Sequence, residues 1–578
     1  MSTLWRRVWG GIRVLPERPF GVDGVSLLMA VALVGLLGGL IGFAREWVAA
    51  PRPGVVIDLS PWALPKYTFF SLVRGLLAYL LSLSFTIVYG YWAAKDPTAE
   101  RVLIPLLDVL QSIPVLGFMP GLVLAMTALF PSSHAGLELA AVVMIFTGQV
   151  WNMAFSWYHA LRSVPRDLVE VAELYRLSAW QRLRWVEGPF ATVGLVWNSM
   201  MSMAGGWFFL MVSESFVLGG RDFRVPGLGS YMSEAVARGD IRAMVLAVLA
   251  MVLMIVVLDQ FLWRPVAVWS QKFRIEEVGS GGEARSWFLE WFRRSALGRW
   301  LRRRMRRVRD SGGGRMKRES RLDVLFRPAV GRGLSKAALV GLLAALGYGG
   351  WALFRLLGSV PPETWQAVFL AAWVTLGRVL LATGISTLWT VPVGLWIGLS
   401  PERSRVLQPV VQVLAAFPAP MLFPAVVWLL THWGVPLAWG SVVLQLLGTQ
   451  WYILFNVIGG ATVVPGDLRE SVDVFRVDGL RRFWTLYLPT IFPYLVTGWV
   501  TAAGGAWNAS IVSEYVVFRG RVLTTFGLGA QISEAAARGD FPALAAGVAL
   551  MAVVVVVFNR LVWKRLYSLS ERRFSMSR

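Results

Sequence analysis

Residues 241–263 read IRAMVLAVLAMVLMIVVLDQFLW, and residues 541–563 read FPALAAGVALMAVVVVVFNRLVW. Each stretch is apolar over roughly the 20 residues that a helix needs to cross about 30 Å of hydrocarbon. The chain of 578 residues is 56% hydrophobic and 16% charged, whereas soluble domains are about 25% charged. This composition excludes a soluble enzyme and predicts an all-α integral membrane protein.

Twelve apolar stretches of spanning length occur along the chain, six on each side of a polar segment. They are residues 25–44, 67–94, 103–130, 137–156, 190–218, 241–263, 337–357, 365–399, 406–431, 437–460, 489–518 and 541–563. We therefore expect about twelve transmembrane helices. The segment before them carries four arginines and no small-residue cleavage site after a short apolar core, so we do not expect a signal peptide.

The polar segment at residues 264–336 is the most basic part of the chain and includes the cluster RRRMRR at residues 302–307. Its glycine-rich breaks are typical of a flexible linker. We expect it to join a first six-span domain at residues 1–263 to a second at residues 337–578. Attraction to anionic lipid headgroups explains its charge more simply than binding of nucleic acid.

Basic residues also predict the orientation in the membrane. The loop at residues 159–189 holds five arginines, whereas the loops at residues 131–136 and 358–364 hold none. Arg and Lys are retained on the cytoplasmic side, and an even number of spans then places both termini in the cytoplasm. The chain is therefore expected to be a multi-pass protein of the inner (plasma) membrane.

The two halves of the chain repeat one sequence. The landmarks that return 300 positions later are Val164-Pro165, Glu170, Pro189, Trp207, Ser213-Glu214, Gly227-Leu228-Gly229 and Ala237-Arg238-Gly239-Asp240. Earlier in each half the spacing is 304, which pairs Arg74 with Arg378. Because both halves have six spans, they share one orientation, and the sequence predicts two parallel repeats with a solute path at their interface.

Each half contains a long cytoplasmic loop between its fourth and fifth spans, whereas most connections in helical bundles are short. The first loop reads EVAELYRLSAWQR at residues 170–182 and reaches Pro189 nineteen positions after Glu170. The second loop has the same spacing from Glu470 to Pro489. This pattern resembles the EAA loop of binding-protein-dependent ABC importer permeases, and both halves look like the nitrate/sulfonate/taurine branch of that family. The resemblance covers nearly all of both halves outside the linker.

The resemblance implies that each loop docks on an ATPase subunit. The positions it assigns to this role are Glu170, Ala172, Arg176 and Pro189 in the first loop and Glu470, Val472, Arg476, Gly479 and Pro489 in the second. The family usually has two alanines after the glutamate and a glycine six positions after it, where this chain has Arg176 or Arg476. A solvated amphipathic loop helix without a partner is the simpler alternative.

The chain has no Gly-x-x-x-x-Gly-Lys-Ser/Thr phosphate loop. The resemblance therefore implies that two copies of a separate cytoplasmic ATPase bind ATP and magnesium, and that this chain is not an enzyme and holds no cofactor. It also implies an extracytoplasmic solute-binding protein and a small solute such as nitrate, bicarbonate, taurine or another sulfonate. The alternative is a self-contained secondary transporter or channel, which predicts coupled acids at mid-membrane in both halves. We find only Glu214 and Glu514.

Six residues are candidates for the translocation path, namely Arg74, Arg378, Trp207, Trp507, Glu214 and Glu514. A guanidinium in hydrocarbon costs at least about 2.5–3.5 kcal/mol, so each arginine is expected to face either an anionic solute or a carboxylate or carbonyl partner. The tryptophans stand beside paired glycines and form either an aromatic wall or ordinary helix contacts. The three histidines are scattered along the sequence, so no metal site is predicted.

Overall fold

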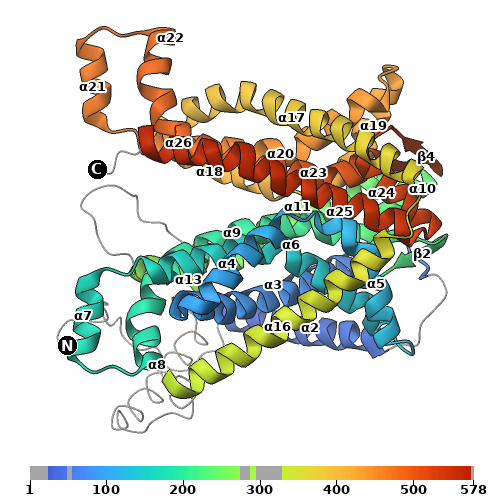
Figure 1. The fold of residues 1–578 in the computed structure, drawn as a ribbon, viewed down its shortest axis with the longest axis horizontal. Coiled ribbons are helices and arrows are strands. Elements are labelled where there is room, and N and C mark those ends of the chain that lie inside the picture. The colour runs from blue at the N-terminus through green and yellow to red at the C-terminus, as the bar shows by residue number, and fades with distance from the viewer. Residues whose placement is uncertain (1–23, 49–54, 274–286, 295–327, 575–578) are drawn as a thin grey trace.

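The computed structural model describes residues 24–48, 55–273, 287–294 and 328–574, and Figure 1 shows them as two bundles of long helices lying side by side. The long helices of the first half are α2 (Gly24–Val48), α3 (Leu64–Lys95), α4 (Pro97–Ser112), α5 (Val115–Leu129), α6 (Ala135–Arg162), α9 (Gly188–Ser213) and α11 (Ile241–Leu258). Those of the second half are α16 (Pro328–Leu357), α17 (Pro362–Gly398), α18 (Pro401–Ala416), α19 (Phe423–His432), α20 (Leu437–Thr462), α23 (Leu488–Ser513) and α25 (Phe541–Phe558). The predicted helical class is confirmed.

Eight helical segments in the described part of the chain are long and apolar enough to cross a membrane, and the bent pair of α4 and α5 makes a ninth candidate. The eight are Pro61–Lys95, Ala135–Arg162, Ala179–Ser213, Ile241–Phe273, Gly333–Leu357, Pro362–Gly398, Leu437–Thr462 and Phe541–Ser570. The other predicted spans correspond to α2, to α18 with α19, and to α23. All twelve predicted stretches are thus helical over most of their length.

The third span of each half, expected at 103–130 and at 406–431, is divided into two helices at a proline. The chain bends by 101° between helices α4 and α5. Ile113, which precedes Pro114, has ψ 123°, and Phe417, which precedes Pro418, has ψ 128°. Crowding by a proline ring disfavours helical geometry in the preceding residue, and this explains both breaks.

The predicted spans 190–218 and 489–518 end too late, because each of these spans is followed by a β-hairpin. Strand β1 (Ser215–Leu218) pairs antiparallel with β2 (Arg221–Arg224), and β3 (Tyr515–Phe518) pairs with β4 (Arg521–Thr524). The turn residues are Gly219 (φ 56°), Gly220 (φ 72°), Arg519 (φ 50°) and Gly520 (φ 72°). Two successive residues with positive φ match the twist of a two-residue hairpin. Each hairpin leads into a short helix, α10 (Leu228–Arg238) or α24 (Leu528–Arg538).

The duplication extends to small irregularities of the backbone. A π-helical turn precedes α9 at Leu183–Glu187 (η2) and α23 at Phe483–Tyr487 (η6). Another follows α11 at Asp259–Trp263 (η3) and α25 at Asn559–Trp563 (η7). Each pair begins at positions 300 residues apart. The spacing read from the sequence therefore holds for local geometry and for the order of the elements.

The expected linker at 264–336 is partly helical in the described residues. Helix α12 (Arg264–Ser270) continues from η3, α13 covers Trp287–Arg294, and α16 already begins at Pro328. The basic cluster at residues 302–307 lies outside the described residues, as do the arginines before the first span. The expected domain boundary at residue 337 therefore falls inside α16.

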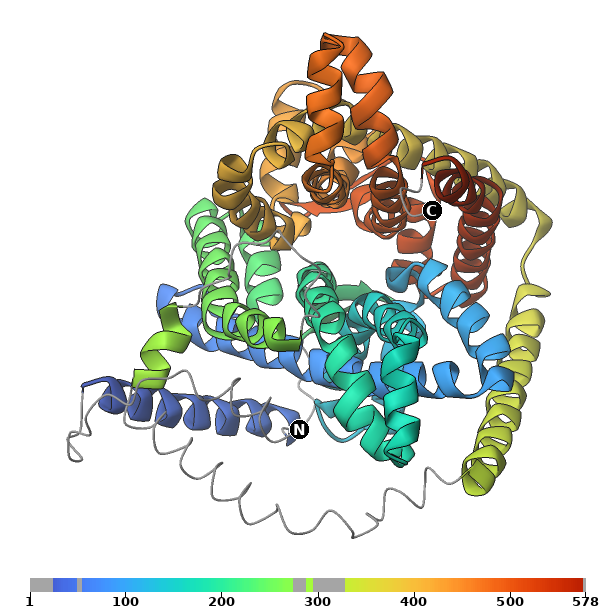
Figure 2. The same cartoon turned by 90° about the vertical axis from the view of Figure 1, so that its left-hand side faces the viewer.

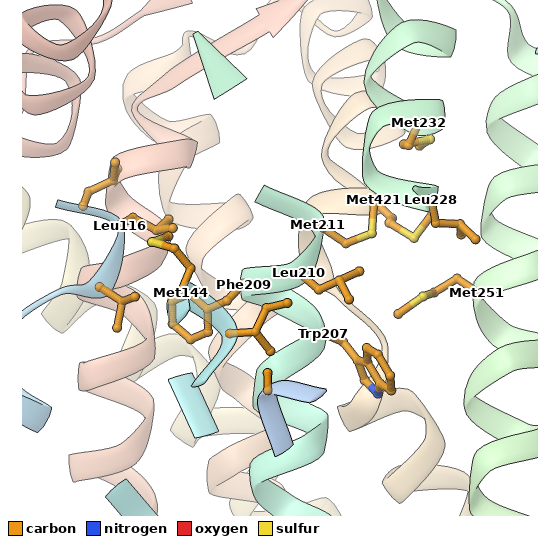
Figure 3. Close-up of a cluster of buried hydrophobic side chains, with 14 of the residues drawn as sticks. Leu116, Met144, Trp207, Phe209, Leu210, Met211, Leu228, Met232, Met251 and Met421 are labelled. Atoms are coloured by element: carbon orange, nitrogen blue, oxygen red, sulfur yellow. The ribbon is translucent and has the colours of Figure 1, made fainter. Parts of the chain in front are cut away.

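The two halves share a buried core. Met421 of the second half belongs to the same hydrophobic cluster as Leu116, Trp207 and Met211 of the first (Figure 3). Figure 2, which looks at the end carrying the long loops, shows α16 at the outer edge of both halves. There the Ser335 hydroxyl accepts a hydrogen bond from Trp92 Nε1 (2.9 Å) and donates one to Asp96 Oδ2 (2.5 Å).

Both ends of the molecule therefore hold contacts between the halves. The hydrogen bond from Ser335 lowers the pKa of Asp96 below its usual value, which keeps this acceptor ionised. At the opposite end, the amides of Gly219 and Gly220 donate to the carbonyl oxygens of Ala536 (3.0 Å) and Ala537 (2.9 Å). The first hairpin is thereby joined to the C-terminal turn of α24.

Candidate translocation path and coupling loops

The two long loops form matching helical hairpins that project from one end of the molecule (Figure 1). They consist of α7 (Arg166–Leu174) with α8 (Ala179–Arg182) and α21 (Gly466–Val474) with α22 (Gly479–Arg482). We call these two pairs the coupling loops. Glu170 and Glu470 are exposed on them, whereas Ala172 packs inward and is 2% exposed. Pro189 and Pro489 each stand in the first turn of the following long helix.

The tips of the coupling loops carry large apolar side chains that are exposed. Leu174 and Tyr175 are exposed on the first loop, and Val474, Phe475 and Leu480 on the second. Contiguous exposed apolar residues of this kind mark surfaces that bind another protein. The shape and exposure of both loops therefore fit the docking role that the family resemblance implies for them.

The structure explains why the family that the loops resemble usually has a glycine six positions after the glutamate, where this chain has an arginine. Arg176 (φ 46°) and Arg476 (φ 51°) have left-handed backbone conformations. In α7 the amide of Leu177 bonds to the Ala172 carbonyl (3.0 Å) and that of Arg176 to the Glu173 carbonyl (2.9 Å). This is the Schellman motif, in which glycine usually occupies the left-handed position. The chain thus retains the motif and accepts strain at an exposed arginine in each loop.

We expect Arg176→Gly to slow hydrogen exchange of the α7 amides by roughly fivefold, because a side chain in the left-handed region costs about 1 kcal/mol. Arg166→Gly, at the first helical position of the same element, is the matched control. It should speed exchange, since glycine weakens ordinary helical positions. Equal effects of the two substitutions in hydrogen-exchange mass spectrometry would contradict the role of backbone strain.

Each coupling loop is held to the membrane helices by a different contact, which the sequence did not reveal. In the first half, Glu187 is 1% exposed and accepts hydrogen bonds from Lys95 Nζ (2.6 Å) and Arg182 Nε (2.6 Å). In the second half, Arg469 donates to the carbonyl oxygens of Leu399 (3.1 Å) and Ala461 (3.2 Å). The loops are therefore attached to the ends of α3, α17 and α20, which suits the transmission of movement. The only signal in the sequence was an acid directly before Gly188-Pro189.

Arg74 lies in a closed site between two carboxylates. Its guanidinium group, 0% exposed, bonds to both oxygens of Glu138 (2.8 Å each) and to Glu214, and it donates to the carbonyl of Pro226 (3.2 Å). Glu214 Oε2 also accepts from the amide of Gly229 (2.6 Å) in the first turn of α10. This cluster therefore fixes α10 against α3 and α6.

Arg378 occupies the corresponding place with one carboxylate fewer. Its Nη1 donates to Glu514 Oε1 (2.9 Å) and to the carbonyl of Phe526 (2.9 Å), and its Nη2 donates to Thr525 (3.0 Å). Glu514 Oε2 accepts from the amide of Gly529 (2.9 Å). The sequence left open whether each arginine faces an anionic solute or a carboxylate or carbonyl partner. In both halves the arginine is paired with a carboxylate.

A cavity of about 480 Å³ lies between the two halves. Residues that line it include Thr147, Trp151, Asn152, Trp197, Asn198, Phe208, Trp451, Tyr452, Asn456, Thr501, Trp507, Asn508, Asn559 and Trp563. A smaller cavity of about 70 Å³ shares several of these residues and adds Trp207 and Asp259. The two tryptophans predicted for the path therefore reach these cavities, whereas Arg74, Arg378, Glu214 and Glu514 line neither. In the described residues no cluster of three or more His, Asp or Glu could hold a metal ion.

Comparison with known proteins agrees with this geometry. The family model described as binding-protein-dependent transport system inner membrane component matches residues 86–262 and 390–576. A bicarbonate transport system permease protein of Synechocystis is 26% identical over 152 residues, covering 26% of this chain and 53% of that protein. A taurine transport system permease protein of Escherichia coli is 25% identical over 35% of this chain and 68% of its own length. A riboflavin transport system permease protein of Chloroflexus aurantiacus is 29% identical over 40% of this chain and 83% of its own length.

The family matches cover most of the chain and fall once in each half, in agreement with the internal repeat. This chain spans about half the length of the bicarbonate permease that it matches. The relatives are permease components of transporters, which agrees with the expectation that this chain is not itself an enzyme. The chain therefore belongs to the family of binding-protein-dependent transport system inner membrane components, as a multi-pass inner-membrane protein with two such domains in one polypeptide.

Proposed function

We propose that the chain is the complete permease pair of an ABC importer and that one cytoplasmic ATPase subunit docks on each coupling loop. The observation that carries this proposal is the presence of two matching loops at one end, each with an exposed glutamate and exposed apolar tips. Two loops require two ATPase copies, which would bind ATP and magnesium. A self-contained secondary transporter offers no reason for either loop.

The docking end is the cytoplasmic end in this proposal. The last described helix, α26 (Lys564–Phe574), runs to the same end as α7 and α21 (Figure 1), in keeping with a cytoplasmic C-terminus. The hairpins and the short helices α10 and α24 then face outward, where a solute-binding protein would deliver its cargo. ATP binding would draw the ATPase subunits together, and the contacts of Glu187 and Arg469 would move the bundles as rigid bodies.

The solute is small, and the relatives named above are permeases for bicarbonate, taurine and riboflavin. An anionic solute was expected from Arg74 and Arg378. Their positions lend that expectation no support, because both guanidinium groups are paired with glutamates away from the cavity.

Glu170→Ala combined with Glu470→Ala is expected to lower solute uptake by at least about tenfold, the effect of losing about 1.4 kcal/mol of docking free energy. The tagged chain should copurify with an ATPase subunit, and the double variant should retain less of it. Glu402→Ala is the matched control, since this exposed acid lies at the start of α18 outside the coupling loops. Unchanged uptake and unchanged copurification in the double variant would refute the docking role.

A further inference from the structure

We propose that the cavity between the halves accepts an uncharged organic solute with a planar ring and amide-like edges, and that it disfavours inorganic oxyanions. This inference rests on the function proposed above and names the substrate class of the same path. It follows from the charge, the side-chain chemistry and the size of the cavity.

None of the residues that line the 480 Å³ cavity is Asp, Glu, Lys, Arg or His. Asp259 is the only charged residue that lines the smaller cavity, and its Oδ2 is paired with Arg264 Nε at 3.1 Å. An ion that leaves water for such a site loses hydration without gaining an opposite charge, which is costly. An uncharged solute does not meet this barrier.

At the helix breaks beside the cavity, several of the N-terminal amides already have acceptors. Half-helix N-termini can bind anionic groups when their amides are free. Here the first amide of α5, Val115 N, already donates to Asn508 Oδ1 at 2.7 Å. In the second half, the amides of Met421 (3.1 Å) and Leu422 (2.9 Å) bond to carbonyl oxygens within their own turn.

The side chains of the cavity match a flat, hydrogen-bonding molecule. Five tryptophans line it, namely Trp151, Trp197, Trp451, Trp507 and Trp563. Their faces favour stacking on another ring. Trp197 of the first half and Phe455 of the second lie 5.9 Å apart between centroids, so aromatic rings approach each other across the interface.

Amides complete the lining. The residues that line the cavity include Gln111, Asn152, Asn198, Asn456, Asn508 and Asn559. Some of their polar atoms are already bonded within the protein, because Asn508 Oδ1 accepts from Val115 N and the Nδ2 groups of Asn198, Asn456 and Asn508 donate to Ser156, Tyr452 and Gly504. An amide side chain offers both donors and an acceptor, which suits the N–H and C=O edges of an imide or carboxamide ring. The volume is within the range of about 300–1,000 Å³ found for sites of drug-sized ligands, and it is far larger than one bicarbonate ion needs.

Binding of three uncharged ring probes tests the proposal without the ATPase. Uracil, nicotinamide and riboflavin are titrated against the full chain in nanodiscs of uncharged lipid, with bicarbonate and taurine as competitors. At least one ring probe should bind, and equal concentrations of the competitors should leave that binding unchanged. Failure of all three probes to bind, or displacement by bicarbonate or taurine, would overturn the proposal.

Two variants connect binding to the cavity. Trp197→Ala is expected to weaken binding of the probe by about fivefold, because a stacking contact is lost. Trp373 is an exposed tryptophan of α17 outside the cavity, so Trp373→Ala should leave binding of the probe unchanged. Asn152→Lys adds a cation to the cavity wall and should introduce taurine binding that the natural chain lacks. Equal effects of the two tryptophan variants, or no gain in taurine binding, would count against the assignment.

Failure of this inference is distinguishable from failure of the proposed function. The nanodisc titrations report solute chemistry alone, whereas copurification and the Glu170→Ala/Glu470→Ala variant report docking. A chain that copurifies with its ATPase and binds taurine in preference to the rings would retain the importer assignment and lose the substrate class.

Discussion

Arg74→Met is expected to abolish accumulation of the folded chain in the membrane, whereas Arg378→Met should only reduce it. Removing Arg74 leaves Glu138 and Glu214, which are 1% and 0% exposed, without their counter-charge. Breaking a buried ion pair by removing one partner costs about 3–5 kcal/mol, and here two carboxylates lose the same cation. Most proteins have only about 5–15 kcal/mol of stability to lose.

The second half provides the matched comparison. Arg378 is 9% exposed and faces one carboxylate, and Glu514 keeps hydrogen bonds from Thr375 and from the amides of Gly529 and Ala530 after the arginine is removed. The measurement is fluorescence-detected size-exclusion chromatography of tagged chains, with the melting temperature of the material that remains. Combining Arg74→Met with Glu138→Gln and Glu214→Gln should restore part of the monodisperse peak, because it removes the uncompensated charges.

A different outcome would revive the prediction made from the sequence. If Arg74→Met accumulated and melted like the natural chain but lost uptake of an anion, the guanidinium would act on solute, and the carboxylates would be incidental neighbours. Normal accumulation together with normal uptake would show that the cluster does not stabilise α10 against α3.

Features that depend on periodicity and repetition were predictable from the sequence. The helical class and the two coupling loops need only residues close together in the chain, and the spacing of 300 needs only a comparison of the sequence with itself. The proline breaks were only partly predictable, because Ile113-Pro114 and Phe417-Pro418 indicate a change of backbone direction without giving its angle. The hairpins were missed because their β-branched and aromatic strands continue the apolar pattern of the preceding helices.

The partners of the buried arginines were harder to predict, since they depend on contacts between distant segments. Glu138 is 64 residues from Arg74 in sequence and has no acid at the corresponding position of the second half, where Ala438 stands. One signal was available, because Glu138 is the only charged residue in the predicted span 137–156, and a lone charge in a span requires a partner. The uncharged lining of the cavity could not be predicted, since it depends on which faces of α6, α9, α20 and α23 meet.

A disulfide between the halves is expected to stop transport. A Cβ placed at Gly117 in α5 would lie 3.7 Å from Cβ of Val548 in α25. Disulfides have a mean Cβ–Cβ separation of about 3.8 Å, so Gly117→Cys with Val548→Cys should oxidise readily. The chain contains no cysteine, so no other bond can form. If the polypeptide is also cut between residues 295 and 327, oxidation should convert two half-length bands into one full-length band on a non-reducing gel.

The expected loss of uptake is at least about tenfold, because alternating access by rigid-body movement requires α5 of one half to shift against α25 of the other. Each single cysteine variant controls for the change in packing, and a reducing agent should restore uptake in the double variant. If ATPase subunits dock as proposed, their ATP hydrolysis should continue at a basal rate, since neither position touches a coupling loop. Efficient cross-linking with undiminished uptake would mean that the contact between α5 and α25 stays fixed during transport. The surface along which the halves move would then have to lie elsewhere, at the joined ends of the hairpins or along the tryptophan-lined cavity.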